Sequence, residues 1–273
     1  GGGLPPEPAA GIQLDVALEP GEGVRSGLLA ELCADRRREP AAARELLCSW
    51  DGNMAADSAA ATVFVHFTNA LLDRALADDL PAGVDDRDWH FVQSLPQFEV
   101  RAQSLLADPT AAAVWDDAQT EVVEDRAAIV EAAFVAAVAE AGARYGSDVD
   151  GWAWGRVRPL VLRHAFAPND GALGWVLNAE PLAIGGGPET VYKNQFARSD
   201  RERMNPVVGP IVRFTVDLAD PWKATYSLAG GQSGWPRSPH YGDLLADWAV
   251  GRGRALTPEP SPGDRSGRLL PAG

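Results

Sequence analysis

The chain has 273 residues, a length that suits one large domain or two modest ones. With 46% of its residues hydrophobic it can build a substantial core, and its formal net charge of −14 disfavours nucleic acid as a partner. No apolar run of about 18 residues is present to span a membrane. The first residues, Gly1-Gly-Gly-Leu-Pro-Pro6, lack the basic and apolar regions of a signal peptide, and the chain begins without Met. We therefore expect a fragment of a longer precursor, with no nucleic-acid or membrane partner.

The first third of the chain is predicted to be a flexible lead-in followed by helices. Residues 1–23 are rich in Gly, Pro and Glu, a composition that cannot bury much apolar surface. Two short helical patterns follow over residues 24–49. The sequence Trp50-Asp-Gly52 ends the second one, because glycine readily takes the left-handed conformation past a helix end. A longer helix is predicted next, with Asp57 or Ser58 as its N-cap.

The two cysteines, Cys33 and Cys48, both lie among leucines in helical patterns. Such surroundings favour buried free thiols. One disulfide between adjacent helices is the alternative, since the sequence does not establish the distance between the sulfur atoms.

The middle of the chain is predicted to be helical as well. Residues 97–118 indicate short helices, and residues 120–144 give the clearest helical pattern of the chain. Thr120 is the predicted N-cap of that helix, and Glu121 and Glu124 suit the positive end of its dipole. The apolar positions at helical spacing predict the buried stripe, which consists of Val123, Ala127, Val130, Phe134 and Val138.

From about residue 150 the pattern changes from helices to short alternating runs, which predict strands. These runs are 157–162, 175–178, 211–218 and 224–228. The predicted organisation is a lead-in (1–23), a helical knob domain (24–149), a β-rich segment (150–251) and a loose tail (252–273), an α+β fold. The strands are few, so their apolar faces and open edges need another segment to pair with.

Several sequence blocks occur in a fixed order over roughly residues 45 to 251. They are Trp50-Asp-Gly-Asn-Met-Ala-Ala-Asp-Ser-Ala-Ala60, Thr120-Glu121, Trp152-Ala-Trp-Gly155, Gly185-Gly186 with Glu189-Thr-Val191, Gly209 to Pro221, Gly231-Gln-Ser-Gly234, Ser238-Pro-His-Tyr241, Asp243 and Trp248-Ala-Val-Gly251. Together they resemble the C-terminal end of the penicillin acylase family, amidases whose nucleophile is the first residue of a processed β-subunit.

The resemblance implies a fold and a function. The β-rich segment would complete the αββα sandwich of an N-terminal nucleophile (Ntn) hydrolase, with the helices as a knob on the β-subunit. The whole enzyme would hydrolyse linear amides of acylated amines, such as β-lactam antibiotics or acyl-homoserine lactones. Its partners would be the upstream β-subunit sequence, the α-subunit and a small-molecule amide substrate, and its precursor would be periplasmic or secreted. The alternatives are a catalytically silent structural fragment and an independent small-molecule binding module.

No residue of the chain is assigned a catalytic role. The nucleophile and oxyanion-hole residues of the resembled family lie upstream of this segment, and residue 1 is Gly. Ser233 resembles a nucleophile elbow, but Trp235 stands where the second glycine of that motif is needed, so we expect a structural turn. Ser233, His240 and Asp243 could be drawn as a triad, although closeness in sequence says little about catalytic geometry.

Asp217 is the sharper candidate for an indirect role. It ends the predicted strand 211–218, where its carboxylate could orient a distant His or the α-amine of the nucleophile. The competing interpretation, which we favour, is an aspartate that satisfies a loop at the end of a strand.

No metal or cofactor is assigned to this segment. The resembled family often binds calcium, which is therefore possible in the full enzyme. The acidic residues of this chain lack the spacing of a calcium loop. Those considered are Asp51, Asp57, Asp116 and Asp117.

Four positions depart from the resembled pattern. Arg158 replaces a His, Tyr192 an Asn, Trp235 a small or polar residue, and Leu244 a Gln. These changes are compatible with a divergent substrate pocket or with relaxed selection.

Overall fold

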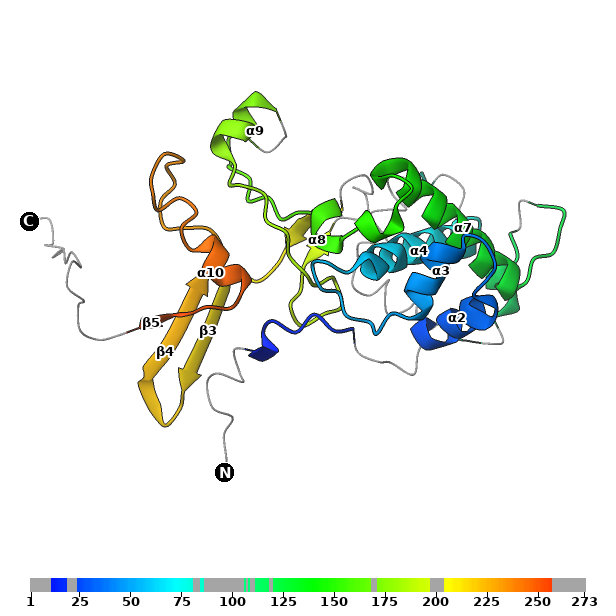
Figure 1. Ribbon diagram of the computed structural model, residues 1–273, viewed down its shortest axis with the longest axis horizontal. Helices are drawn as coiled ribbons and strands as arrows, with labels where there is room; N and C mark the ends of the chain where they lie inside the picture. Colours follow the sequence, from blue (N-terminus) through cyan, green and yellow to red (C-terminus); the bar gives the residue numbers. More distant parts are fainter. Residues whose placement is uncertain are drawn as a thin grey trace, which may run out of the picture. The chain divides into compact units, whose positions relative to one another are not determined.

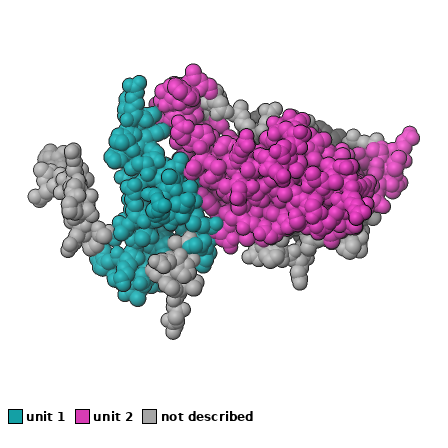
Figure 2. All heavy atoms as spheres, in the orientation of Figure 1, with its two compact units in different colours: residues 1–14, 210–273 teal, residues 15–209 magenta. Residues whose placement is uncertain are grey.

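The computed structural model describes residues 11–18, 24–80, 84–85, 106, 108, 111–117, 120–167, 171–196 and 204–256. The chain divides into two compact units, coloured in Figure 2: unit 2 is residues 15–209, and unit 1 combines residues 1–14 with 210–273. Most of the predicted lead-in, of the loose tail and of the short helices over 97–118 falls outside the described residues. The predicted division into four segments stays a prediction.

Unit 2 is built around two long helices, α4 (Ala59–Leu76) and α7 (Arg126–Tyr145), which pack against each other (Figure 1). The predicted N-cap of α4 is confirmed, since the Ser58 hydroxyl accepts a hydrogen bond from the Ala61 N–H at 3.2 Å. Phe67 of α4 meets Phe134 of α7 edge to face at the centre of the core. The shorter elements around them are α2 (Val24–Leu32), η1 (Cys33–Asp35), α3 (Ala41–Cys48), η2 (Ala112–Trp115) and η3 (Val149–Gly151).

Helix α7 begins later than the sequence predicts. Its N-cap is Asp125, whose carboxylate accepts from the Ala128 N–H at 2.9 Å, whereas the Thr120 hydroxyl donates to Glu124 in the preceding loop. The predicted stripe is correspondingly wrong at Val123, which is 83% exposed, and at Ala127, which is also exposed. The stripe that faces the core has positions one turn apart along the true helix: Ile129, Val130, Ala133, Phe134, Ala137 and Ala141.

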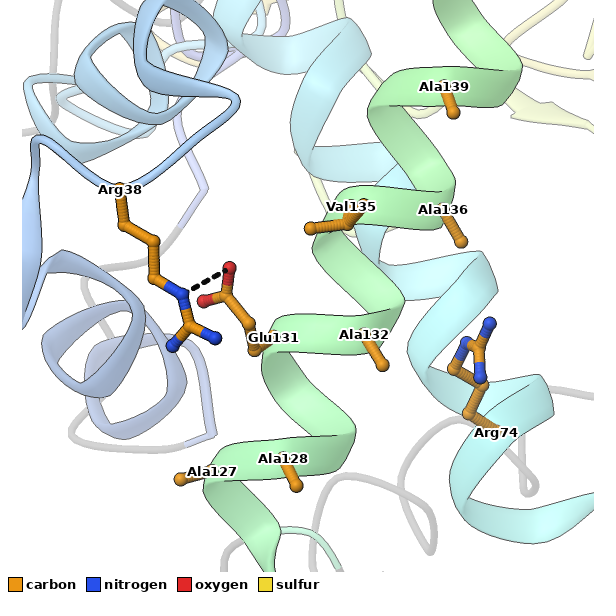
Figure 3. A pocket seen from close by; sticks show the side chains of 9 residues that line it. All are labelled: Arg38, Arg74, Ala127, Ala128, Glu131, Ala132, Val135, Ala136 and Ala139. Carbon is orange, nitrogen blue, oxygen red and sulfur yellow. Dashed lines mark ion pairs between the residues drawn. The ribbon is translucent and has the colours of Figure 1, made fainter.

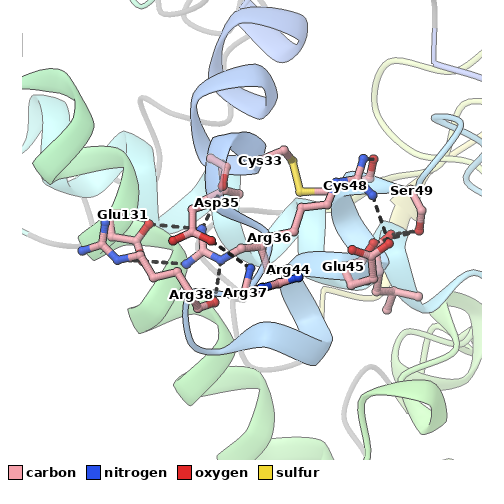
Figure 4. The surroundings of a disulfide bond; sticks show 12 residues. Cys33, Asp35, Arg36, Arg37, Arg38, Arg44, Glu45, Cys48, Ser49 and Glu131 are labelled. Carbon is pink, nitrogen blue, oxygen red and sulfur yellow. Dashed lines mark hydrogen bonds and ion pairs between the residues drawn. A yellow bond between two sulfur atoms is a disulfide. The ribbon is translucent and has the colours of Figure 1, made fainter.

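The predicted free thiols are wrong, because Cys33 and Cys48 form a disulfide (Figure 4). The bond joins η1 to the end of α3, and the Cα atoms lie 5.7 Å apart, within the usual range. Each cysteine directly follows a buried leucine, Leu32 or Leu47, but is itself only half-buried. The neighbouring leucines therefore predicted the helices correctly, but they did not show whether the two cysteines are free or disulfide-bonded.

The second half of unit 2 contains little regular structure. It comprises α8 (Trp154–Val157), α9 (Ala172–Leu177) and a two-stranded antiparallel sheet of β1 (Gln195–Phe196) and β2 (Pro206–Val208). The strand predicted over 157–162 is reduced to an isolated bridge between Leu160 and Leu182. The strand predicted over 175–178 is wrong, because most of it lies in helix α9.

Unit 1 contains a three-stranded antiparallel sheet in the order β3-β4-β5. Strands β3 (Val212–Asp217) and β4 (Asp220–Leu228) confirm the last two predicted strands, and β5 (Arg254–Leu256) adds to the other side of β4. Helix α10 (Leu245–Ala249) precedes β5. Helices together with small antiparallel sheets make this a mixed α+β chain.

On one face the sheet of unit 1 buries polar side chains, and on the other face it exposes several apolar side chains, although Ala224 on that face is buried. Arg213 and Ser227, opposite each other on β3 and β4, are buried on the polar face. The Arg213 guanidinium lies 5.1 Å from the centre of the Trp248 ring of α10 and donates to the Trp248 carbonyl. On the apolar face, Val212, Phe214 and Leu256 are exposed. An apolar sheet face open to solvent is unusual for a complete domain.

Candidate functional site

The loop between β4 and α10 carries the residues that could be drawn as a triad. The His240 Nδ1 atom lies 3.1 Å from Asp243 Oδ2, and the imidazole is largely exposed. The Ser233 hydroxyl oxygen accepts from the Trp235 N–H at 3.1 Å, and the Ser233 N–H donates to the His240 carbonyl at 3.0 Å. Ser233 thus meets His240 through its backbone, and its hydroxyl serves its own turn.

Close backbone packing explains the glycine before this turn. A Cβ atom on Gly231 would lie 2.1 Å from the His240 carbonyl oxygen and 2.7 Å from that of Tyr241. Only glycine allows these two backbone segments of the loop to approach each other so closely. The Gly-Gln-Ser-Gly block therefore has a structural reason that needs no nucleophile.

Asp217 lies at the end of β3, in the tight turn that leads into β4. Its Oδ1 atom accepts a hydrogen bond from the Ala219 N–H at 2.9 Å, an Asx turn that satisfies the loop backbone. This geometry supports the interpretation we favoured from the sequence and gives no support for an orienting role.

Three of the sequence blocks meet in unit 2 at what we call the block junction: Met54, Trp154, Arg158 and Gly186. The Trp154 indole N–H and the Arg158 Nη2 atom both donate to the Gly186 carbonyl at 2.8 Å. In turn, the Gly186 N–H donates to the Met54 carbonyl at 2.8 Å. Trp152 and Trp154 are fully buried, whereas Trp50 is half-buried.

Arg158 is the charged member of the block junction and has no exposed surface. Its guanidinium stacks on the Trp154 ring, 4.1 Å from the ring centre. Burial lowers the pKa of Arg158 to about 9, so the side chain stays charged at neutral pH. Gly186 has a φ of 82°, and a Cβ there would lie 2.1 Å from the Tyr192 carbonyl oxygen. In the sequence these residues stand apart as separate markers of, or departures from, the resembled pattern, and the structure joins them into one structural unit.

A groove of about 600 Å³ runs along the outer face of α7 (Figure 3). Its floor consists of small apolar side chains of the helix, with Arg38 and Arg74 at its sides. Glu131, the one carboxylate among the described residues that line the groove, already pairs with Arg38 at 3.3 Å and with the buried Arg44 at 2.6 Å. None of these described lining residues is therefore poised for acid–base or nucleophilic chemistry.

Two of the acidic residues considered for calcium bond to backbone N–H groups. Asp51 accepts from the Asn53 N–H at 2.8 Å, and Asp116 accepts from the Glu124 N–H at 3.2 Å. Over the described ranges, no group of three or more His, Cys, Asp or Glu side chains is placed to hold a metal ion.

No helix of the described part is both long and apolar enough to cross a bilayer.

Comparison with known proteins relates the whole chain to one family. The penicillin amidase family model matches residues 4–261. Similar proteins include the acyl-homoserine lactone acylase QuiP of Pseudomonas putida, 30% identical over 212 residues, which are 77% of this chain and 25% of that protein. The Pseudomonas fluorescens (strain Pf0-1) QuiP is 26% identical over 220 residues, 80% of this chain and 26% of that protein. The penicillin acylase 2 proenzyme of Pseudomonas sp. (strain SE83) is 27% identical over 242 residues, 88% of this chain and 29% of that protein. The chain thus spans about a quarter of the length of the curated relatives it matches.

Proposed function

Because the chain belongs to the penicillin amidase family, we propose that it is the C-terminal part of the β-subunit of an amidase. The whole enzyme hydrolyses the linear amide of an acylated amine and releases the acyl group through an acyl-enzyme. The observation that carries this proposal is the family match over residues 4–261, which contains every block that meets at the block junction. The relatives named as acylases, one of them a proenzyme, support the reaction class and the processing of a precursor.

This chain supplies structure to that enzyme, and its nucleophile lies elsewhere. In the loop that carries Ser233, the hydroxyl caps the turn, and Asp217 caps another turn. These contacts favour a chain that is inactive by itself. The acyl-enzyme chemistry and the oxyanion hole belong to the upstream sequence, as does any calcium site.

The open sheet face of unit 1 supports a partner for this chain. Val212 lies opposite Leu228, and Phe214 lies opposite Tyr226, so these side chains share one face, with Leu256 next to Ala224 on the neighbouring strand. Burying this face removes apolar surface from water, which stabilises an assembly by about 25 cal/mol per Å². We assign it to the upstream β-subunit sequence, so that the sheet completes the αββα sandwich, with the α-subunit as a further partner.

The disulfide supports an oxidising compartment for the whole protein. Disulfides such as Cys33–Cys48 persist in secreted and periplasmic proteins and are rare in the cytosol. We therefore include a periplasmic or secreted location in the proposal.

The test uses the full coding sequence around this chain. Expression of the complete precursor should give two subunits by mass spectrometry, with Ser, Thr or Cys as the first residue of the larger part that contains this chain. The purified protein should release fatty acid from acyl-homoserine lactones or phenylacetate from a phenylacetyl amide. Substitution of that first residue by Ala should abolish release. A complete gene that encodes no such residue, or an intact precursor without amidase activity, would favour the silent structural fragment.

A further inference from the structure

In unit 2, residues 160–167 and 171–182 form the two sides of an arm, which lie side by side in Figure 1, and the second side contains helix α9. At the base, Leu160 and Leu182 exchange two backbone hydrogen bonds, at 2.8 and 2.9 Å. Further along, the Ala179 N–H donates to the Leu162 carbonyl at 3.1 Å, and the Asn178 side chain accepts from the His164 N–H at 2.8 Å. The arm is therefore held in shape by its own hydrogen bonds.

The end of this arm exposes large apolar side chains. Trp175 is 87% exposed and Phe166 is 79% exposed, and Leu173 and Val176 are more than half exposed. Helix α9, with the sequence Ala-Leu-Gly-Trp-Val-Leu, carries no charged residue. A helix of six residues is too short to be stable by propensity alone, so packing against another surface must contribute. Aromatic side chains of this kind are frequent energetic centres of protein interfaces.

We propose that the end of the arm docks into an apolar groove on the part of the same protein that lies outside this chain, with Trp175 as the anchor. This inference rests on the chain being part of a longer protein and is independent of the reaction that protein catalyses. The chain covers only 25–29% of the relatives cited above, so most of the protein is available as the partner.

The size of the arm argues for this occupant over a second copy of the chain. Stable association of separate proteins buries about 1,200–2,000 Å² in total, far more than one six-residue helix and a neighbouring Phe can supply. A contact within one assembly needs much less area, because the other contacts between its parts already hold the two surfaces at high effective concentration.

The charge of the chain argues against the remaining occupants. Helices that lie on membrane surfaces carry Lys and Arg on their polar side, and α9 has none. The net charge of −14 further opposes approach to an anionic lipid surface or to another copy. An uncharged apolar groove within the same protein requires no Lys or Arg on α9, and the negative charge of the chain does not repel it.

The decisive measurement is hydroxyl-radical footprinting of the full-length, processed protein, read residue by residue by mass spectrometry. Trp175 and Phe166 should be oxidised several-fold more slowly in the native protein than in the same protein in urea, at every protein concentration. Equal oxidation rates in the two states would overturn the proposal. So would protection that appears only at high concentration, which points to a second copy, or only with anionic vesicles, which points to a membrane.

A pair of variants provides an independent readout in the same full-length protein. Trp175→Ser should increase hydrogen exchange over residues 171–178 and also in a segment outside this chain, which locates the groove. Val123→Ser is the matched control, because Val123 is exposed to a similar degree, 83%, but lies in the loop before α7. It should leave exchange in both regions unchanged. Changes confined to the arm itself would contradict docking. An inactive protein that still protects Trp175 would contradict the proposed function and leave the arm proposal standing.

Discussion

Replacing Arg44 with Met should destabilise the helical part of the chain by about 3–5 kcal/mol. The guanidinium is 1% exposed, and each of its nitrogens donates hydrogen bonds. Nε donates to the Arg38 carbonyl at 2.8 Å, and Nη1 to the Leu32 carbonyl at 3.0 Å. Nη2 donates to the Glu39 carbonyl at 3.2 Å and to the Glu131 carboxylate at 2.6 Å. Methionine keeps an unbranched apolar stem and removes every donor.

The magnitude follows from the acceptors that the substitution leaves behind. Three backbone carbonyls lose a donor. That of Leu32 is buried, and leaving a buried acceptor unsatisfied costs about 1–3 kcal/mol, whereas those of Arg38 and Glu39 belong to exposed residues and lose less. The Glu131 side chain is 14% exposed and keeps its ion pair with Arg38, so the substitution removes only one of its two arginine partners. Water can also reach part of the opened site, which reduces the sum. The total therefore falls near the cost of breaking a buried ion pair rather than at the full sum of the separate losses.

Urea denaturation followed by far-ultraviolet circular dichroism measures this loss. The matched control is Arg36→Met in the same disulfide loop, whose pair with Glu45 at 3.0 Å is about half exposed. Such a surface pair contributes about 0–1 kcal/mol, so the control should unfold close to wild type. If Arg44→Met also unfolds within about 1 kcal/mol of wild type, the reasoning from buried hydrogen bonds is refuted.

Three further predictions concern the disulfide, the block junction and the missing nucleophile. Cys33→Ser should lower the free energy of unfolding by about 3 kcal/mol, because the disulfide closes a loop with a sequence separation of 15. A thiol reductant should destabilise the wild type and leave the stability of the variant unchanged. Gly186→Ala should cost at least about 1–3 kcal/mol by thermal melting, since its φ is 82° and the new Cβ would meet the Tyr192 carbonyl oxygen, whereas Gly234→Ala, with no atom within 4 Å, should be neutral. The chain expressed alone should not hydrolyse phenylacetyl or fatty-acyl anilides, and turnover that disappears on Ser233→Ala would disprove this.

Local sequence determined those elements whose ends are specified by nearby residues. Helix α4 begins where Ser58 can cap it, and its apolar positions repeat at helical spacing toward α7. Strands β3 and β4 follow an alternating pattern interrupted by a short turn, in which Asp217 satisfies the backbone. The ordered blocks likewise identified the family, because several short matches in one order are far more specific than any of them alone.

Local signals failed where two residues could serve the same role or where a segment is short. Thr120 and Asp125 are both competent N-caps, and the pairing of Thr120 with Glu124 in the preceding loop leaves the capping role to Asp125. The run that starts at Trp175 has the aromatic and branched residues of a strand. It forms a helical turn instead, in which the Trp175 N–H donates to the Gly171 carbonyl and the Asn178 N–H to the Gly174 carbonyl, each at 2.8 Å.

Only the tertiary structure decided which distant residues meet. It placed Cys33 within bonding distance of Cys48, and it brought Trp154 and Arg158 onto the carbonyl of Gly186, which follows them by about thirty residues. It also left the apolar face of the β3–β4–β5 sheet and the end of the arm exposed. Sequence patterns report the spacing of residues along one element, whereas burial depends on which other element covers that surface. For these two surfaces no element among the described residues provides that cover, which is why we propose partners for them.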